Sequence, residues 1–223
     1  MKNVKFKLRT ARAQFFLLSF FILPFAFFLS GCASYDAGGN VQRGRYALLR
    51  GDSRQALGYF QAASQVDPNY TYRIGPMKEG VFTYVGRAHY DSGDIKAAQN
   101  ALEQARQRHP DDYFAPLYLG LTLSKDGDRP RGAKELQTGL TGLHDWLDYI
   151  DRNSVDKAYW DPGAYIRSGI REQLARIDSR EINWPELIAG AERVGRELEE
   201  EADQVNTWKR RDQRDSAKGD RGN

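Results

Sequence analysis

The sequence predicts an all-α fold in which three helix hairpins stack into an array and two further helices close its C-terminal end. Gly-Asp dipeptides recur through the first part of the chain, and small residues follow each of them at fixed distances. The last third carries apolar residues at helical spacing. Hydrophobic residues are 40% and charged residues 28% of the 223 residues, which is ordinary for a globular chain and argues against wholesale disorder.

The N-terminal segment predicts an export signal. Residues 2–12 are basic, and residues 15–29 form a continuous apolar run, shorter than the ~20 residues that a bilayer-spanning helix needs. A basic stretch followed by such a run is typical of a secretory signal. Residues 1–31 hold five of the 33 basic residues and no acid, so the other 28 bases face 30 acids. This balance argues against a nucleic-acid-binding surface.

The apolar run is followed by the single cysteine of the chain. Leu29-Ser30-Gly31-Cys32 resembles the lipobox of bacterial lipoproteins. The resemblance implies cleavage before Cys32, with a diacylglycerol and an N-acyl chain on that residue, and several acyl chains anchor a protein stably. Ala33 stands where an Asp would imply inner-membrane retention, so the resemblance implies an outer-membrane anchor that faces the periplasm. The alternative is an uncleaved membrane anchor with an incidental cysteine.

An internal repeat follows this segment. Gly-Asp dipeptides begin at Gly51, Gly93 and Gly127, with spacings of 42 and 34 residues. A glycine precedes each by seven residues, small residues follow after five and twelve, and a bulky apolar residue follows after nine. Small residues let two antiparallel helices cross closely, and glycine takes the positive φ of a turn without strain. The sets are Gly44, Ala56, Phe60 and Ala63; Gly86, Ala98, Leu102 and Ala105; and Gly120, Gly132, Leu136 and Gly139.

This pattern resembles the tetratricopeptide repeat (TPR), a family whose two-helix units stack into a solenoid. The registers fall at 37–70, 79–112 and 113–146, and the third has His144 where the other two have a helix-ending proline. An insert, residues 71–78, separates the first two registers and contains a helix-breaking Gly-Pro pair. Such inserts map to a loop on one face, often a binding face. The alternative is a longer hairpin without a binding role.

The C-terminal third predicts two amphipathic helices that cap the last repeat. The first is expected to have Asp161 as its N-cap and Pro162 as its first residue. The second is expected to start after Asn183, with Glu197 and Glu199–Glu201 mostly on its outer side. The apolar stripes are Ile166, Ile170, Leu174 and Ile177, and then Leu187, Ala191, Val194, Leu198, Ala202 and Val205.

Residues 209–223 carry dense charge of both signs without apolar periodicity, which predicts a disordered tail. Its basic start, Lys209-Arg210-Arg211, is expected to be solvated; contact with anionic lipid or glycan is the alternative. The expected organisation is a lipoprotein signal peptide over 1–31, a lipidated tether over 32–36, three TPR-like repeats over 37–146, a helical cap over 147–208 and the tail over 209–223.

No arrangement typical of an enzyme stands out in the sequence. The three histidines include no i, i+4 pair, and the single cysteine excludes a multi-thiolate metal site. The phosphate-binding loop and the nucleophile elbow are also missing. We therefore expect no catalytic residue, no metal and no cofactor apart from the lipid.

A binding surface is the remaining prediction. In TPR proteins the first helix of each repeat lines a concave groove, so the resemblance implies a groove that binds a protein segment. Arg45 and Arg87 hold equivalent positions in successive repeats, which suits a carboxylate or an acidic segment. The alternative is that they pair with nearby acids such as Asp91. The groove residues implied are Val41, Arg45, Leu48, Thr83, Tyr84, Arg87, Tyr90, Phe114, Leu117, Tyr118 and Leu121.

These features predict a membrane-tethered periplasmic TPR adaptor that binds a protein partner in cell-envelope or secretion-machinery assembly. One alternative is an assembly factor that delivers a subunit to the outer membrane. Another is a protein that binds or cleaves cell-wall glycan through Tyr159, Trp160, Tyr165 and Trp184. Self-association through the last repeat is a further alternative.

Overall fold

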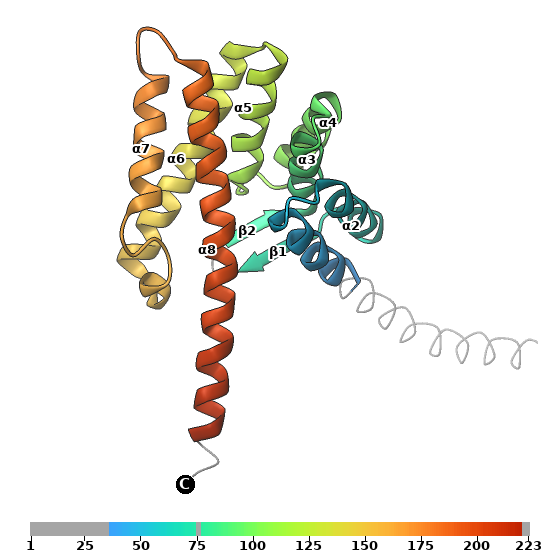
Figure 1. The fold of residues 1–223 in the computed structure, drawn as a ribbon, viewed down its shortest axis with the longest axis vertical. Coiled ribbons are helices and arrows are strands. Elements are labelled where there is room, and N and C mark those ends of the chain that lie inside the picture. Colours follow the sequence, from blue (N-terminus) through green and yellow to red (C-terminus); the bar gives the residue numbers. More distant parts are fainter. Residues whose placement is uncertain (1–35, 75–76, 220–223) are drawn as a thin grey trace, which may run out of the picture.

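The computed structural model describes residues 36–74 and 77–219, and it confirms that the fold is helical (Figure 1). The expected signal peptide, the lipobox and Cys32 lie outside the described residues. Within the described part, no helix has both the length and the apolar character needed to cross a membrane.

Three helix hairpins follow one another along the chain. The first pairs residues 36–49 with α2 (Ser53–Val66), the second pairs α3 (Val81–Asp91) with α4 (Ile95–Arg108), and the third pairs α5 (Phe114–Asp126) with α6 (Arg129–Asn153). The glycine of each Gly-Asp dipeptide has positive φ, at 78°, 80° and 100°. The aspartate after it caps the next helix by accepting a bond from the backbone N–H three residues on. The recurrent dipeptide is therefore a turn and a helix start.

The glycine that precedes each dipeptide marks where the two helices of a hairpin cross. A Cβ placed on Gly44 would lie 2.4 Å from the Phe60 ring, and one on Gly86 would lie 2.4 Å from Cγ of Leu102. A Cβ on Gly120 would lie 2.5 Å from the backbone nitrogen of Leu136. The glycine and the bulky residue recur at the same spacing because they contact each other where the two helices of each hairpin cross.

The insert forms a strand pair rather than a loop. β1 (Thr71–Ile74) and β2 (Met77–Gly80) are antiparallel, with Thr71 opposite Gly80; residues 75–76 lie outside the described part. Ile74 and Met77 are buried in the core. The strands satisfy their backbone groups by pairing while these two side chains leave water.

Helix α6 passes the expected end of the third repeat at residue 146 and continues to Asn153. His144 does not interrupt a helix as proline would, and Leu147 and Ile150 extend the buried face of α6. A 3₁₀ turn, η1 (Val155–Ala158), then leads towards α7 (Tyr165–Ile177).

The start of α7 differs from the prediction. Asp161 and Pro162 precede the helix, and Ala164 is its N-cap residue. Asp161 has a φ of 45° and still acts as a cap, because its carboxylate accepts bonds from the backbone N–H groups of Ile166 and Arg167 at 2.9 and 3.0 Å. The prediction named the right side chain but placed it too close to the helix in sequence.

Helix α8 (Trp184–Gly219) runs along the molecule against α5 and α7, and its C-terminal part projects beyond the other helices (Figure 1). All six residues of its predicted apolar stripe are at most 2% exposed. The helix continues through residues 209–219, where the sequence predicted disorder. Extending an existing helix requires no new nucleation, and lysine and arginine are good helix formers.

The described residues form two apolar cores. The smaller core joins the first hairpin to α3 and α4, with Phe60 stacked on Tyr84 at a centroid distance of 5.0 Å. The larger core joins the third hairpin, α7 and α8 and extends to Ile74 and Met77 of the strand pair. Helix α3 contributes to both cores, so the second hairpin links the two parts of the molecule.

Candidate functional site

The predicted groove is not an open surface in the structure. Ten of its eleven residues are at most 4% exposed, and Leu48 is half-buried. Helix α8 contacts this inner face through Glu192, Gly195 and Glu199. A Cβ on Gly195 would lie 2.8 Å from the hydroxyl of Tyr118, so the glycine allows α8 to approach closely. The expectation of a groove open to a partner segment is therefore wrong along most of its length. The ten buried residues are Val41, Arg45, Thr83, Tyr84, Arg87, Tyr90, Phe114, Leu117, Tyr118 and Leu121.

A buried network of charges lies where α8 meets the hairpins. Arg45 Nε donates to Glu199 Oε1 at 2.6 Å, and Arg87 Nη1 donates to Glu199 Oε2 at 2.8 Å. Arg87 Nη1 also donates to Glu79 Oε1 at 2.6 Å. All four side chains are at most 3% exposed. The two arginines share a carboxylate of the chain itself, on α8, in place of the acidic partner segment that was predicted; pairing with an acid of the chain was the alternative, although the acid is Glu199 and not Asp91. The predicted outer position of Glu199 is wrong.

The two carboxyl groups of this network differ in pKa. Burial raises the pKa of Glu79 to about 8, against the lowering effect of Arg87. Burial acts in the same direction on Glu199, but Arg87 and Arg45 outweigh it and hold the pKa of Glu199 below its ordinary value. Glu199 is therefore the ionised partner of both arginines at neutral pH, and Glu79 is mostly protonated.

Aromatic rings complete the surroundings of the arginines. The guanidinium carbon of Arg87 lies 4.9 Å from the ring centroid of Tyr118 and 5.4 Å from that of Phe114. That of Arg45 lies 5.0 Å from the ring of Tyr72. Cation–π contacts of this kind are worth about 0.5–2 kcal/mol each, more when desolvated. Several predicted groove residues therefore stabilise an internal ion network.

Displacement of α8 by a partner helix would be energetically costly. Each large apolar side chain of the stripe that returned to water would cost about 1.5–3 kcal/mol. Arg45 and Arg87 would in addition lose a buried carboxylate partner, and breaking such a pair costs about 3–5 kcal/mol. The total is comparable with the whole stability of a typical domain, about 5–15 kcal/mol. We therefore treat α8 as a fixed wall of the site.

An open cleft of about 420 Å³ remains beside α8. Four predicted groove residues line it, together with residues from the first turn, from α3 and α5, and from α8. The lining is Leu48, Leu49, Gly51, Ser53, Arg87, Tyr90, Asp91, Tyr118, Lys125, Glu192, Arg196, Glu199 and Glu200. Its volume is in the range of cavities that hold small ligands or a few side chains.

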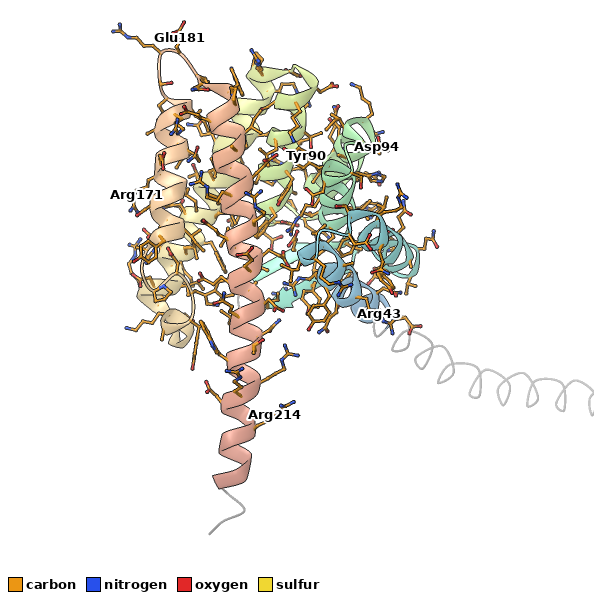
Figure 2. The ribbon with its side chains drawn as sticks, in the orientation of Figure 1. Arg43, Tyr90, Asp94, Arg171, Glu181 and Arg214 are labelled. Atoms are coloured by element: carbon orange, nitrogen blue, oxygen red, sulfur yellow. The ribbon has the colours of Figure 1, made fainter. Side chains whose placement is uncertain are left out.

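Hydrogen bonds fix one side of this cleft. Glu192 Oε1 accepts from the Tyr90 hydroxyl at 2.6 Å and from Lys125 Nζ at 3.0 Å. The rings of Tyr90 and Tyr118 meet edge to face at 5.9 Å. Figure 2 places the labelled Tyr90 between α8 and α3. The α8 contribution was missed at the sequence level, although Glu192, Gly195 and Glu199 are spaced three and four apart and so share one helix face.

The C-terminal aromatic residues do not form a common surface. Trp160 is 1% exposed and packs edge to face on Trp146 at 4.9 Å. The ring centroids of Tyr159 and Trp208 are 6.0 Å apart. Trp184 precedes Trp208 by 24 residues in α8, which places it about 36 Å away along the helix at 1.5 Å per residue. Tyr165 is 83% exposed. The predicted aromatic binding surface is therefore split along α8, and one of its four members is a core residue.

Within residues 36–74 and 77–219, no group of three or more His, Cys, Asp or Glu side chains is placed to hold a metal ion. Comparison with protein-family models, with curated proteins and with solved structures gave no match for this chain. Function therefore has to be inferred from the cleft beside α8 and from the N-terminal sequence.

Proposed function

We propose that this chain is a membrane-tethered periplasmic adaptor of the TPR type, which binds a protein partner during assembly of the cell envelope or of secretion machinery. The observation that carries the proposal is the cleft of about 420 Å³ that remains open between the hairpins and α8. Arginine and tyrosine side chains, which are enriched at binding hot spots, are among those that line this cleft. The repeated Gly-Asp turns and glycine crossings support the TPR assignment.

The N-terminal sequence supports the tether. The described helix begins at residue 36, four residues after Cys32, and four residues span at most about 14 Å. A lipid on Cys32 would hold the first hairpin, which contributes Leu48, Leu49, Gly51 and Ser53 to the cleft, close to the bilayer surface. Tethering raises the effective concentration of the cleft towards a membrane-bound partner without any new contact.

Site-specific photocrosslinking in intact envelopes tests the proposal. A photoreactive phenylalanine analogue would replace Leu49, which is 38% exposed and lines the cleft. The matched control replaces Tyr149, which is 62% exposed on α6 and is not part of the cleft lining. We expect a protein adduct from position 49 and none from position 149. The adduct from position 49 is expected to be weaker in the Cys32→Ser variant, which lacks the lipid attachment site. The same adducts from both positions, or none from either, would refute binding at the cleft.

A further inference from the structure

The last part of α8, residues 209–219, carries the opposite charge to the rest of the folded protein. These residues, the projecting end of α8, hold five bases and two acids, whereas residues 36–208 hold 22 bases and 27 acids. Figure 1 shows the projecting end extending beyond the other helices, so its positive charge is separated from the acidic body. An anionic surface would therefore attract the projecting end and repel the body.

The bases of the projecting end gather on one face of the helix. At about 3.6 residues per turn, four of the five bases fall within about 100° of the helix circumference, and neither acid falls within that arc. A basic face without acids is the pattern of a helix that lies against an anionic surface. The four residues, which form the basic stripe, are Arg210, Arg211, Arg214 and Lys218.

The described arginines of the basic stripe have no acidic partner within the protein. Arg210, Arg211 and Arg214 are exposed, and none of them forms an ion pair with another residue in the part of the chain that the structure describes. The nearest acid in sequence, Asp212, accepts a hydrogen bond from the Tyr159 hydroxyl at 2.8 Å and so faces the body. The charge of the stripe is therefore available to an external surface.

The projecting end also lies on the side of the molecule from which the predicted lipid anchor would extend. Figure 2 places Arg43, on the helix over residues 36–49, nearer to Arg214 than to Glu181 along the long axis of the molecule. Cys32 stands four residues before residue 36, a span of at most about 14 Å. A lipid on Cys32 would therefore bring the projecting end towards the bilayer and leave the turn around Glu181 at the far end.

We propose that the projecting end of α8 is a second membrane contact, in which the basic stripe binds the headgroups of anionic phospholipids. A lipid anchor and a basic segment together hold a peripheral protein more stably than either alone. Anionic lipid is favoured over an acidic protein segment because the anchor already holds the stripe near a bilayer. The inference rests on the tether of the proposed function and adds orientation to it, since two contacts fix the direction of α8, and with it the cleft, relative to the membrane.

Fluorescence of the full-length protein on vesicles tests this contact. A dansyl amino acid, whose emission rises when it leaves water for a lipid surface, replaces Ser216 in the projecting end or Glu181 as a control. The vesicles are phosphatidylcholine alone, or phosphatidylcholine with about one-third anionic phosphatidylglycerol. We expect the emission from position 216 to be about twofold higher on the anionic vesicles, and the difference to disappear in about 0.5 M salt, which screens the attraction. Equal emission from position 216 on both vesicles, or equal rises at positions 216 and 181, would overturn the inference.

Two double variants locate the contact in the basic stripe. Arg210→Gln/Arg214→Gln removes two charges of the stripe and is expected to remove most of the emission difference at position 216. The matched control, Arg180→Gln/Arg193→Gln, removes the same charge from two exposed arginines outside the stripe, one of them on α8, and is expected to keep the difference. Glutamine is a good helix former, and circular dichroism checks that both variants keep their helix content. Equal losses in the two variants would contradict a role for the stripe.

The envelope crosslink from position 49 separates this inference from the adaptor function. An emission rise on anionic vesicles without an adduct from position 49 would support the membrane contact and refute binding of a partner at the cleft. An adduct from position 49 with equal emission on both kinds of vesicle would support the adaptor function and refute the membrane contact. A response of position 216 to soluble peptidoglycan fragments, and not to anionic vesicles, would assign the stripe to glycan and overturn the inference.

Discussion

At the scale of single residues, the packing of each hairpin depends on a glycine, which has no side chain, at the point where its two helices cross. Gly120 faces the backbone of α6, and its missing Cβ leaves the two helices in direct contact. Gly58, by contrast, lies on the exposed side of α2 with nothing within 4 Å of an added Cβ. The two glycines look alike in sequence and differ only in what they face.

This difference predicts opposite signs for the same substitution. Gly120→Ala is expected to lower the free energy of unfolding by about 1–3 kcal/mol, because backbone atoms of α6 cannot move aside as a flexible side chain can. Gly58→Ala is expected to raise it by about 0.5–1 kcal/mol, because alanine restricts the unfolded chain and favours the helix. Urea denaturation of both variants measures the two values. Equal changes would show that the contact at Gly120 is absent in solution.

At the scale of elements, α8 has a buried part that belongs to the core and an exposed C-terminal part. From Leu187 to Val205 it supplies a buried stripe to the larger core. Beyond Trp208 its described side chains are exposed, and Tyr159 reaches Asp212 by a hydrogen bond of 2.8 Å. A polar helix that packs on nothing is marginal in water, so this part depends on the helix that precedes it.

Two truncations test this division. Ending the chain after Trp208 is expected to change the free energy of unfolding by less than about 1 kcal/mol, the worth of one exposed hydrogen bond. Ending it after Glu197 removes Leu198, Glu199, Ala202 and Val205 and is expected to abolish cooperative unfolding, because Arg45 and Arg87 lose their shared carboxylate. Thermal denaturation followed by circular dichroism compares the two. Loss of the cooperative transition in the protein that ends at Trp208 would assign a structural role to residues 209–223.

At the scale of the whole molecule, the buried charges lie at the boundary between the two cores. Arg45 belongs to the first hairpin, Arg87 to α3 and Glu199 to α8, so one ion network connects all three. Buried ion pairs add little net stability compared with apolar packing, and their geometric demands fix how the parts fit together. We attribute the fixed position of α8 across the repeats to this network and to the apolar stripe together.

Glu79 makes the stability of the whole molecule depend on pH. Its pKa is about 8 in the folded protein, above the ordinary 4.5 of the unfolded chain. Between these values the folded state holds a proton that the unfolded state has lost, so stability from this group falls as the pH rises from 5 to 8. The Glu79→Gln variant keeps an oxygen acceptor for Arg87 and does not titrate. We expect the melting temperature of the wild type to fall relative to this variant over that range. Parallel curves would contradict the raised pKa.

The sequence determined the local parts of this protein. The glycines of the Gly-Asp dipeptides predicted the turns, and the apolar stripe of α8 predicted its buried face, because turn conformation and helix periodicity depend on residues close in the chain. The lipobox resemblance and the export signal lie in the N-terminal segment and remain predictions.

Only the tertiary structure decided what covers the inner face of the repeats. Glu199 stands 154 residues from Arg45, and no periodicity relates them. Sequence spacing placed the two arginines in equivalent positions and left open whether a partner or the chain itself supplies their acid; it could not show that the acid is Glu199 on α8. The physical reason is that burial and charge pairing depend on which distant surfaces meet, and packing of α8 against α5 and α7 determines that. The same packing buried most of the groove and left the cleft beside α8 open.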